Sequence, residues 1–229
     1  DLRRILKKMP GVGSRQTMLF SATLSSKVQE LAFEYMHDPA SIEITPENIT
    51  VETVTQRVYH VSLDEKMKLL IGLLKKENPE SALIFTNMKT KAAEVARRLT
   101  HNGFGCEYII GDLPQKKRLN IINAMKTGKI RILVATDVAA RGLHINDLDL
   151  VVNYDLPANP ESYVHRIGRT ARAGKEGKAI TLVCERYVYG LEPIESLINM
   201  KIPVAWPTDE DFAADVTAGK RMQDEKEKR

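Results

Sequence analysis

The sequence has little cysteine and no long apolar run. Cys106 and Cys184 are its only cysteines, and neither belongs to a C-x-x-C pair. This excludes a disulfide framework and a cysteine-based zinc site, and the sequence suggests no other metal-ligand set. We expect both cysteines to be small buried apolar residues of a reducing, cytoplasmic compartment. No stretch reaches the roughly 18 consecutive apolar residues that a membrane-spanning helix needs.

Two motifs of nucleotide-hydrolysing enzymes are also absent. The chain has no G-x-x-x-x-G-K-[ST] loop, because none of its Gly-Lys pairs is followed by Ser or Thr. No Asp-Glu-x-Asp run follows an apolar strand. Since these motifs supply a phosphate-binding lysine and a magnesium-binding acid, we expect this chain alone to hydrolyse no ATP. The chain opens at Asp1 without a methionine or a signal peptide, and we expect it to be part of a longer protein.

Aromatic residues and excess charge are scarce as well. Aromatic residues make up 6% of the chain, the formal net charge is +4 and the pI is near 8.9. This balance permits nucleic-acid binding without requiring it. The shortage of aromatics argues against recognition by base stacking. Any nucleic acid should therefore be held through its phosphates, independently of base sequence and with an affinity that falls as salt rises.

The pattern along the chain predicts four parts. Residues 1–46 combine helices with short strands at 16–20 and 41–44, and residues 47–56 are a polar linker. Residues 57–206 alternate between strands and helices, and residues 207–229 form a charged tail that we expect to be mobile. Trp206 stands alone near that boundary. We expect it to pack the last strand or loop against the domain, with a partner-binding aromatic as the alternative.

Continuous apolar strands separated by helices predict an α/β fold. Such strands are typical of a parallel sheet that helices cover on both faces. In sheets of this kind, ligands bind at the carboxyl ends of the strands. The predicted strands of the main domain begin at Arg57 and continue at 82–85, 106–110, 130–135, 150–154 and 179–183.

Three of these strand ends lead into a helix through small or hydroxyl residues, at 86–89, 111–118 and 136–142. Free backbone N–H groups and the helix dipole make such places anion sites. Placed side by side, they could follow a phosphate backbone, with Gly111 allowing close approach and Arg118 adding a cation. The alternative is that Asp112 and Thr136 merely cap helices.

The segment 165–172 (HRIGRTAR) carries arginines at every third position, Arg166, Arg169 and Arg172. On one helix they would form a solvated basic face, which is the alternative interpretation. Gly168 and Gly174 interrupt the pattern, so helix stability is not its main purpose. Arginines on a rigid turn suit the terminal phosphate of a nucleotide.

Together these segments resemble the DEAD-box RNA helicases. Ser21-Ala22-Thr23, GDLPQKKR, ATDVAARGLHI and YVHRIGRTARAG are similar to motifs III, IVa, V and VI of that family, in the same order and spacing, over nearly all of residues 1–205. The resemblance implies two RecA-like domains that close over ATP while RNA lies across both. This chain would be the second domain, preceded by a remnant of the first at 1–46.

The resemblance also implies roles for single residues. Ser21 and Thr23 match the motif that couples ATP hydrolysis to unwinding. Arg169 and Arg172 match arginine fingers that reach the γ-phosphate. His165 and Arg166 match a pair that ties the nucleotide site to the RNA site.

Motif V and the RNA-facing segments extend this assignment. Asp137 and Arg141 match residues that support the interdomain cleft and the ATP site. His144 stands where many members have an aspartate near the ribose, and Met88 replaces a frequent threonine. The positions that match RNA-backbone contacts are Asn87, Gly111, Asp112, Arg118 and Thr136.

Partners follow from the same resemblance. ATP would bind with Mg²⁺, held mainly by the N-terminal RecA-like domain, and RNA would bind independently of sequence. The similarity is greatest to a bacterial member that works with an mRNA-degrading ribonuclease complex. Two other functions stay open. The domain could be a protein-docking module of an RNA-degradation assembly, which would not need Arg169 and Arg172, or part of a DNA-directed helicase.

Overall fold

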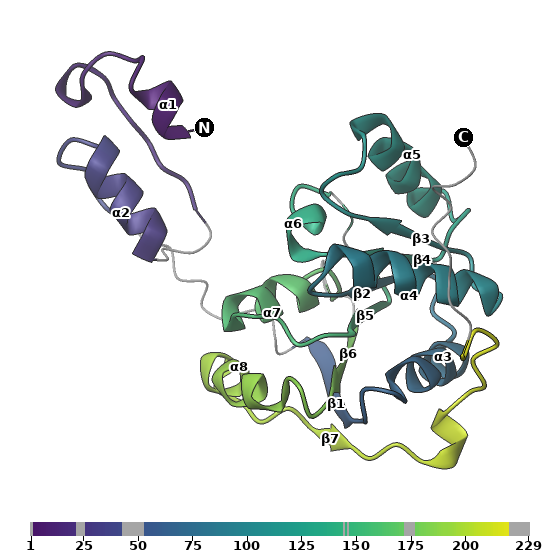
Figure 1. Cartoon of the computed structure of the whole chain (residues 1–229). Coiled ribbons are helices and arrows are strands. Elements are labelled where there is room, and N and C mark those ends of the chain that lie inside the picture. The colour runs from purple at the N-terminus through teal and green to yellow at the C-terminus, as the bar shows by residue number, and fades with distance from the viewer. Residues whose placement is uncertain are drawn as a thin grey trace. The chain divides into compact units, whose positions relative to one another are not determined.

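The computed structural model describes residues 2–21, 26–42, 53–143, 145, 147–171 and 177–219. The chain separates into two compact units, residues 1–47 and 48–229. Figure 1 shows the helices of the first unit and the sheet of the second.

The first unit consists of short helices joined by irregular segments. These are α1 (Leu2–Leu6), η1 (Val12–Ser14) and α2 (Ser26–Tyr35). The Arg15 guanidinium donates to the carbonyls of Pro10 at 2.7 Å and Tyr35 at 3.4 Å. The strand expected at 16–20 is wrong, because these residues are irregular and have no neighbouring strand in the described part of the unit. Of the strand expected at 41–44, the first two residues are irregular and residues 43–44 lie outside the described residues.

The second unit is built on one parallel sheet. Its strand order is β3-β4-β2-β5-β6-β1-β7, and every pairing between neighbours is parallel. This confirms the expected RecA-like α/β fold. The strands are β1 (Val54–His60), β2 (Ala82–Phe85), β3 (Cys106–Ile109), β4 (Ile132–Ala135), β5 (Leu150–Asn153), β6 (Gly177–Val183) and β7 (Val204–Ala205).

Helices cover both faces of this sheet, as its apolar strands require. In β2, Ala82 and Ile84 face a core formed with α3 (Lys66–Glu77) and α4 (Lys89–His101), while Leu83 and Phe85 face the opposite core. Both cysteines are buried and free, which confirms their apolar role. Within the described segments, no helix has the length and apolarity to cross a membrane. The opposite face carries α5 (Gln115–Lys126), α6 (Asp137–Ala140), α7 (Pro160–Ile167) and α8 (Leu191–Ile198).

Strand β1 begins inside the segment expected to be linker. Val54 and Val58 are buried on one face of β1, and Gln56 between them is only 4% exposed. The Gln56 carbonyl oxygen accepts a 2.7 Å hydrogen bond from the Tyr163 hydroxyl. This hydrogen bond gives the buried Gln56 oxygen a partner, so the polar side chain can be buried without leaving the oxygen unpaired. The expected end of the linker at residue 56 is therefore wrong, because β1 already begins at Val54. The polar Gln56 occupies a buried position between Val54 and Val58, and it interrupts the alternation of apolar and polar residues that would have indicated a strand.

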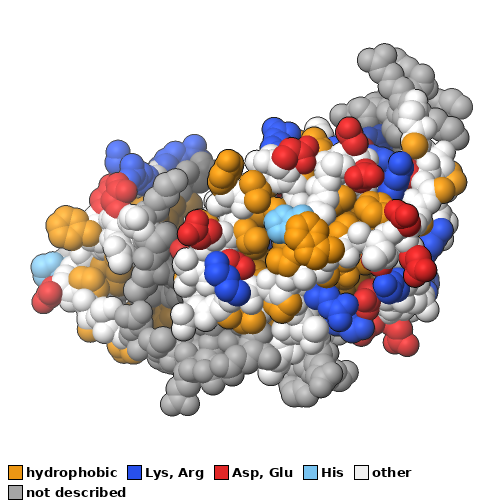
Figure 2. Space-filling model, turned by 90° about the horizontal axis from the view of Figure 1, so that it is seen from below, with side chains coloured by type: hydrophobic (Ala, Val, Ile, Leu, Met, Phe, Trp, Pro, Cys, Tyr) orange, Lys and Arg blue, Asp and Glu red, His pale blue; other side chains and the backbone are white. Residues whose placement is uncertain are grey.

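Trp206 follows β7 and does not pack into the domain. Its side chain is 74% exposed, and its ring stacks on His60, with centroids 5.7 Å apart. Figure 2 shows a histidine on this face beside hydrophobic side chains. The expectation that Trp206 packs the last strand against the domain is thus wrong in its main point, because the indole covers one histidine ring and otherwise meets solvent.

The segment after Trp206 is a strap rather than a mobile tail as far as residue 219. Asp211 in η3 (Asp209–Asp211) accepts from the Lys76 ammonium of α3 at 2.7 Å, and the backbone N–H of Ala213 donates to the Lys68 carbonyl at 3.1 Å. Gly72 of α3 makes room for this crossing, since a Cβ there would lie 1.9 Å from the Asp211 carbonyl oxygen. Residues 220–229 lie outside the described residues.

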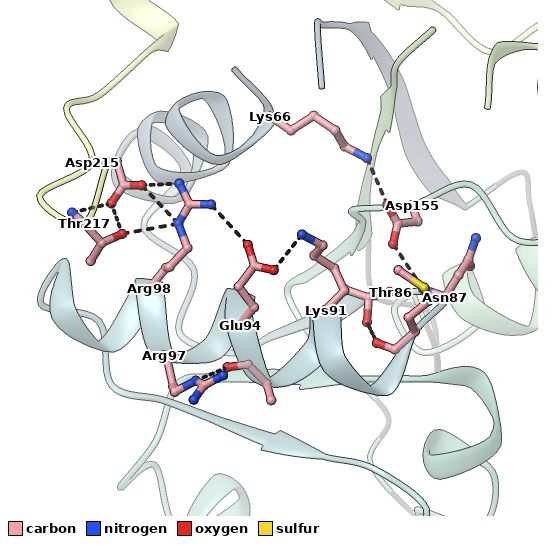
Figure 3. Close-up of polar contacts among 12 residues, drawn as sticks. Lys66, Thr86, Asn87, Lys91, Glu94, Arg97, Arg98, Asp155, Asp215 and Thr217 are labelled. Carbon is pink, nitrogen blue, oxygen red and sulfur yellow. Dashed lines mark hydrogen bonds and ion pairs between the residues drawn. The ribbon is translucent and has the colours of Figure 1, made fainter. Parts of the chain in front are cut away.

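Asp215 fastens the strap to α4 (Figure 3). Its carboxylate accepts from the Arg98 guanidinium, from the Asn102 amide at 2.8 Å and from the Thr217 hydroxyl at 2.7 Å. Asp215 and Thr217 are buried. The prediction of a mobile tail was wrong here because two acids of the charge-rich segment, Asp211 and Asp215, pair with cations on α3 and α4, which composition does not reveal.

The Asp215 pairing should make stability depend on pH. Burial alone would raise the pKa of Asp215, but hydrogen bonds from Arg98, Thr217 and Asn102 outweigh it and hold the pKa well below 3.8. A folded-state pKa below the unfolded value gives stability that is complete above about pH 4 and is lost as the pH falls. We expect Asp215→Asn to lower the free energy of unfolding by about 2 kcal/mol at neutral pH, and by less below about pH 4.

Denaturant unfolding at several pH values measures this difference. Asp209→Asn, a change at an exposed carboxyl of the same segment, is the matched control and should cost little at any pH. An equal loss for Asp215→Asn at pH values on both sides of about 4 would contradict the role of the charge.

Candidate functional site

The carboxyl ends of β4, β2 and β5 lie side by side, since these strands are consecutive neighbours in the sheet. The residues that follow them are polar, with Thr136 and Asp137 after β4, Asn87 after β2, and Asp155 after β5. Helix α7 brings a cation to the same place. Its start is fixed by Pro160 in the first turn and by the Asn159 side chain, which accepts from the Ser162 backbone N–H at 3.3 Å.

Arg166 of α7 joins all three strand ends. Its side chain is 1% exposed, and Nε and Nη2 donate to the two carboxylate oxygens of Asp137 at 2.7 and 2.8 Å. Nη1 donates to the Asp155 carbonyl at 2.7 Å and the Asn153 amide oxygen at 3.3 Å. Nη2 also donates to the Asn87 amide oxygen at 2.9 Å. Each nitrogen of the guanidinium therefore donates to protein groups, which is consistent with a positioning role for Arg166.

A second buried pair continues this network (Figure 3). Lys66, 0% exposed at the start of α3, places its ammonium 3.1 Å from one Asp155 oxygen and 4.4 Å from the Tyr154 ring centroid. The other Asp155 oxygen accepts from the Asn87 backbone N–H at 3.1 Å. The Asn87 side-chain N–H donates to the Leu156 carbonyl at 2.7 Å. Both ends of the Asn87 amide thus bind protein groups, and the RNA contact expected of this side chain stays a prediction.

A basic cluster lies above this frame. His165 is exposed, and its pKa is lowered by partial burial and by the nearby charges of Arg141 and Arg169. Arg169 follows the end of α7, where its backbone N–H donates to the Arg166 carbonyl at 3.2 Å and its carbonyl accepts from Leu148 at 3.2 Å. Arg141 and Arg169 therefore concentrate positive charge around His165 at the strand ends. Arg172 and His144 lie outside the described residues.

The arginines do not share one helix face. Helix α7 ends at Ile167, and the chain turns at Gly168 before it reaches Arg169. Ala171 then takes a left-handed conformation, with φ at 54°. The interpretation as one solvated helical face is therefore wrong for Arg166 and Arg169, and a turn follows the helix as expected.

The three strand-end segments are adjacent, because β3, β4 and β2 are neighbours in the sheet. Gly111 is exposed, and the space a Cβ would occupy there is open. Arg118 of α5 is half-buried and donates to the Ala139 carbonyl at 3.1 Å, which ties α5 to the end of α6. The side chain of Arg118, which was expected to face a phosphate, thus binds the Ala139 carbonyl in this structure.

Helix capping does not explain these polar residues. Pro114 occupies the N-cap of α5, while Asp112 is exposed and pairs with the Lys89 ammonium at 2.7 Å. Thr136 is 7% exposed and sits at the N-cap of α6, but its hydroxyl makes no capping hydrogen bond among the described residues. The alternative that these residues cap helices is thus wrong for Asp112. At Thr136 the position fits a cap, but the side-chain hydrogen bond to the helix backbone that defines a cap is not formed among the described residues.

Sequence reasoning missed part of the site. Lys66, Asn153 and Asp155 were not among the candidates, although the carboxyl-end rule points to Asp155, which follows the apolar run of β5. Nothing in the helical pattern of α3 distinguishes the buried Lys66 from its exposed lysine neighbours. Of the first-unit candidates, Ser21 is exposed and Thr23 lies outside the described residues.

Comparisons with known proteins give one consistent picture. The model of the family described as "Helicase conserved C-terminal domain" matches residues 65–174. The chain is 50% identical to the ATP-dependent RNA helicase RhlB of Xanthomonas oryzae over 92% of its own length and 37% of the relative. It is 46% identical to RhlB of Shewanella piezotolerans over 97% of its length and 51% of that relative. The chain thus spans about half or less of the curated relatives it matches.

Solved structures agree with these sequence relatives. The Escherichia coli DEAD-box protein SrmB, bound to regulator of ribonuclease activity A, is 36% identical. The match covers 69% of this chain and 94% of that chain, with a TM-score of 0.66. Saccharomyces cerevisiae Dbp5, bound to RNA and ADP BeF3, is 28% identical over 89% of this chain and 54% of that chain, with a TM-score of 0.76.

Removing Arg166 should destabilise the second unit strongly. We expect Arg166→Ala to lower the free energy of unfolding by about 3–5 kcal/mol, because buried acceptors lose their partner. Arg166→Lys should recover only part of this loss, since an ammonium lacks the planar fork that meets Asp137 and Asn87 together. Arg141→Ala, at an exposed arginine of the same site, is the control and should cost little. Denaturant unfolding gives the free energy of unfolding of the three variants. Equal values for Arg166→Ala and Arg141→Ala would contradict the stabilising role of the contacts around Arg166.

The titration of His165 tests the basic cluster. We expect nuclear magnetic resonance to place the pKa of His165 below the ordinary value of 6.5. Arg141→Gln should raise the pKa of His165, because it removes a positive charge that disfavours the imidazolium. Arg57→Gln, at an exposed residue of β1, should leave it unchanged. If the pKa of His165 were the same in Arg141→Gln as in the parent chain, the two side chains would not form one cluster.

Proposed function

The chain belongs to the DEAD-box family, as the RecA-like C-terminal domain of an RhlB-type helicase, and we propose that it is the second motor domain of an ATP-dependent RNA helicase. The observation that carries the proposal is the buried frame around Arg166. It holds Arg141, His165 and Arg169 at adjacent strand ends of a parallel sheet, where such folds bind nucleotides. The activity would belong to the longer protein that includes an N-terminal helicase half.

Arg169, together with Arg172, is the proposed pair of arginine fingers. A cluster that lowers the pKa of its own histidine fits an anionic ligand such as a nucleotide, because an anion relieves the repulsion among its cations. Bound ATP would supply the phosphoryl group whose developing charge these arginines stabilise. Arg166 and its partner Asp137 would keep the turn that carries Arg169 in place. His165, Arg141 and His144 would line the nucleotide side of the cleft.

The N-terminal half would hold ATP and Mg²⁺ for the most part. This chain lacks both the phosphate-binding loop and the acidic motif that hold them. Residues 1–46, with Ser21 and Thr23, would complete that half and couple hydrolysis to unwinding. The exposed Phe20 and Phe33 of this first unit are consistent with a piece whose packing partners lie outside the chain.

RNA would bind across the strand ends through its phosphates. Gly111, Asp112, Arg118 and Thr136 lie at neighbouring ends of β3 and β4. The N-cap residues of α5 and α6 make no side-chain capping bonds, which leaves backbone N–H groups available to phosphate. Arg118 and Asp112 would first have to leave Ala139 and Lys89, so we expect these two to contribute less than the backbone does.

A docking role in an RNA-degradation assembly is the second candidate. The relative SrmB has been solved in complex with regulator of ribonuclease activity A, which gives that protein a protein partner. A domain that served only as a dock would not need Arg169 and Arg172 for its task. The loss of activity on mutating Arg169 therefore separates the two candidates.

RNA-stimulated phosphate release tests the proposed function. We expect the chain alone to be silent, and a fusion to the N-terminal half of an RhlB relative to hydrolyse ATP when RNA is added. Arg169→Ala in that fusion should lower the rate roughly 10³-fold, the scale of a lost arginine finger. Arg57→Ala, at an exposed arginine of β1, should keep the rate of the parent.

DNA of the same sequence serves as the nucleic-acid control. Stimulation by RNA and not by DNA supports an RNA helicase, whereas equal stimulation favours the DNA-directed alternative. A folded fusion that stays silent, or that loses nothing on Arg169→Ala, would leave docking as the function to pursue.

A further inference from the structure

A row of buried polar side chains crosses the sheet beneath helix α7. Gln56 of β1 is 4% exposed, Thr181 of β6 and Asn153 of β5 are fully buried, and so is Tyr163 of α7. The core that these side chains enter is built from apolar residues. Burying a polar group in such a core costs free energy unless its hydrogen bonds are formed. The polar row therefore calls for a physical reason other than apolar packing.

These side chains form one hydrogen-bonded series that begins at Arg166, which we call the α7 relay. Arg166 Nη1 donates to the Asn153 amide oxygen at 3.3 Å, and the Asn153 amide nitrogen donates to the Thr181 hydroxyl at 3.1 Å. The Thr181 hydroxyl is hydrogen-bonded to the Tyr163 hydroxyl. The Tyr163 hydroxyl in turn donates to the Gln56 amide oxygen at 2.7 Å. From Arg166 to Gln56, each group can thus donate to the next one.

The relay keeps one pattern of donors and acceptors at ordinary pH. Burial raises the pKa of the Tyr163 hydroxyl well above its usual value of 10, so the hydroxyl stays protonated and can donate to Gln56. The amides and the Thr181 hydroxyl do not titrate. In the described part of the chain, no buried side-chain nitrogen or oxygen lacks a partner. A fully bonded polar network of this kind makes a core rigid and favours one arrangement of it.

Helix α7 is therefore held to the sheet at two points on one face. Tyr163 and Arg166 are three residues apart, so their side chains leave the helix on the same side. Tyr163 connects the helix to β1 and β6, and Arg166 connects it to the ends of β4, β2 and β5. Apolar packing has no preferred direction, whereas hydrogen bonds do. Together the two attachments fix how α7 is rotated and how far it can slide over the sheet.

The position of α7 determines the position of Arg169. The helix ends at Ile167, and the Arg169 backbone N–H donates to the Arg166 carbonyl at 3.2 Å. His165 belongs to the helix itself, and only the turn at Gly168 separates Arg169 from it. A rotation of α7 would therefore shift His165 and Arg169 together.

We propose that Gln56 and Tyr163 are positioning residues for Arg169, through the place that the α7 relay gives to α7. The inference rests on the proposed function, in which Arg169 is an arginine finger. Gln56 lies near the start of β1, away from the carboxyl ends of the strands, so it would act on the reaction only through α7. Stability alone does not account for the relay, because apolar groups of the same shape can replace a hydrogen-bonded pair at little cost.

Variants of the relay separate positioning from stability. Tyr163→Phe and Gln56→Leu each leave a buried group without its partner, so each should lower the midpoint of urea unfolding. The double variant removes both partners and should recover most of that loss. Tyr59→Phe is the matched control, because Tyr59 is a buried tyrosine of β1 whose side chain lies in the core on the opposite face.

Nuclear magnetic resonance of the chain reports the position of α7 without any activity. In the double variant, we expect the Arg166 Nε–H signal to shift and to exchange with water faster, because its bond to Asp137 is less well aligned. The pKa of His165 should rise toward 6.5, since Arg169 lies farther from it. Tyr59→Phe should match the parent chain in both measurements.

Turnover is measured in the fusion to the N-terminal half of an RhlB relative. The double variant should lower kcat roughly 10- to 100-fold, the scale of a misplacement of about 1 Å. The KM for ATP should stay unchanged, because the displaced arginine acts in the transition state. Tyr59→Phe should keep the kcat and the KM of the parent fusion.

Two results would overturn the proposal. If the double variant recovers kcat together with stability, the relay serves stability alone. If its His165 pKa and its Arg166 signal equal those of the parent chain, the position of α7 does not depend on the relay. A silent parent fusion would count against the proposed function instead, and the resonances of the chain would still decide whether the relay positions α7.

Discussion

The buried charge of Arg166 is the constraint on which the functional end of this fold depends. A guanidinium that is 1% exposed is stable only if its donors are matched, since an unpaired buried charge costs several kcal/mol. The matching groups come from the ends of different strands: Asp137 after β4, Asn87 after β2 and Asp155 after β5. Lys66 balances the second carboxylate, so α3 joins the same network. Satisfying one side chain thus fixes the strand ends relative to one another and to α7.

That constraint explains how one short basic segment can divide its labour. Arg166 points into the sheet because it belongs to α7, whereas Arg169 lies beyond the helix end and the turn at Gly168. The first arginine is buried in the frame, and the second lies near His165, as Arg141 does. Under the proposed function, mutation of either would lower the activity of the longer protein, but for different physical reasons. Stability measurements separate them, because only the buried arginine holds the frame.

The sequence predicted the fold well where burial is continuous and poorly where polar groups are buried in pairs. The apolar runs of β2, β4 and β5 sit within their expected ranges, since only a strand covered on both faces needs such a run. Gln56, Lys66 and Asp215 look solvated in sequence, and each is buried against a partner more than 80 residues away. Local pattern cannot reveal such partners. For the same reason the start of β1 and the strap were missed, and the inward turn of Asn87 was not foreseen.

The strap and Trp206 belong to one continuous segment, and the second unit anchors this segment at several points. The segment is held on both sides of Trp206, by β7 pairing before it and by Asp211 and Asp215 after it. A ligand shifts an equilibrium only if it binds two states differently. These anchors lie on β1, on α3 and at the end of α4, and none of them belongs to the ends of β4, β2 and β5. A ligand at those strand ends could therefore reach the strap through α3, where Lys66 pairs with Asp155 and Lys76 pairs with Asp211.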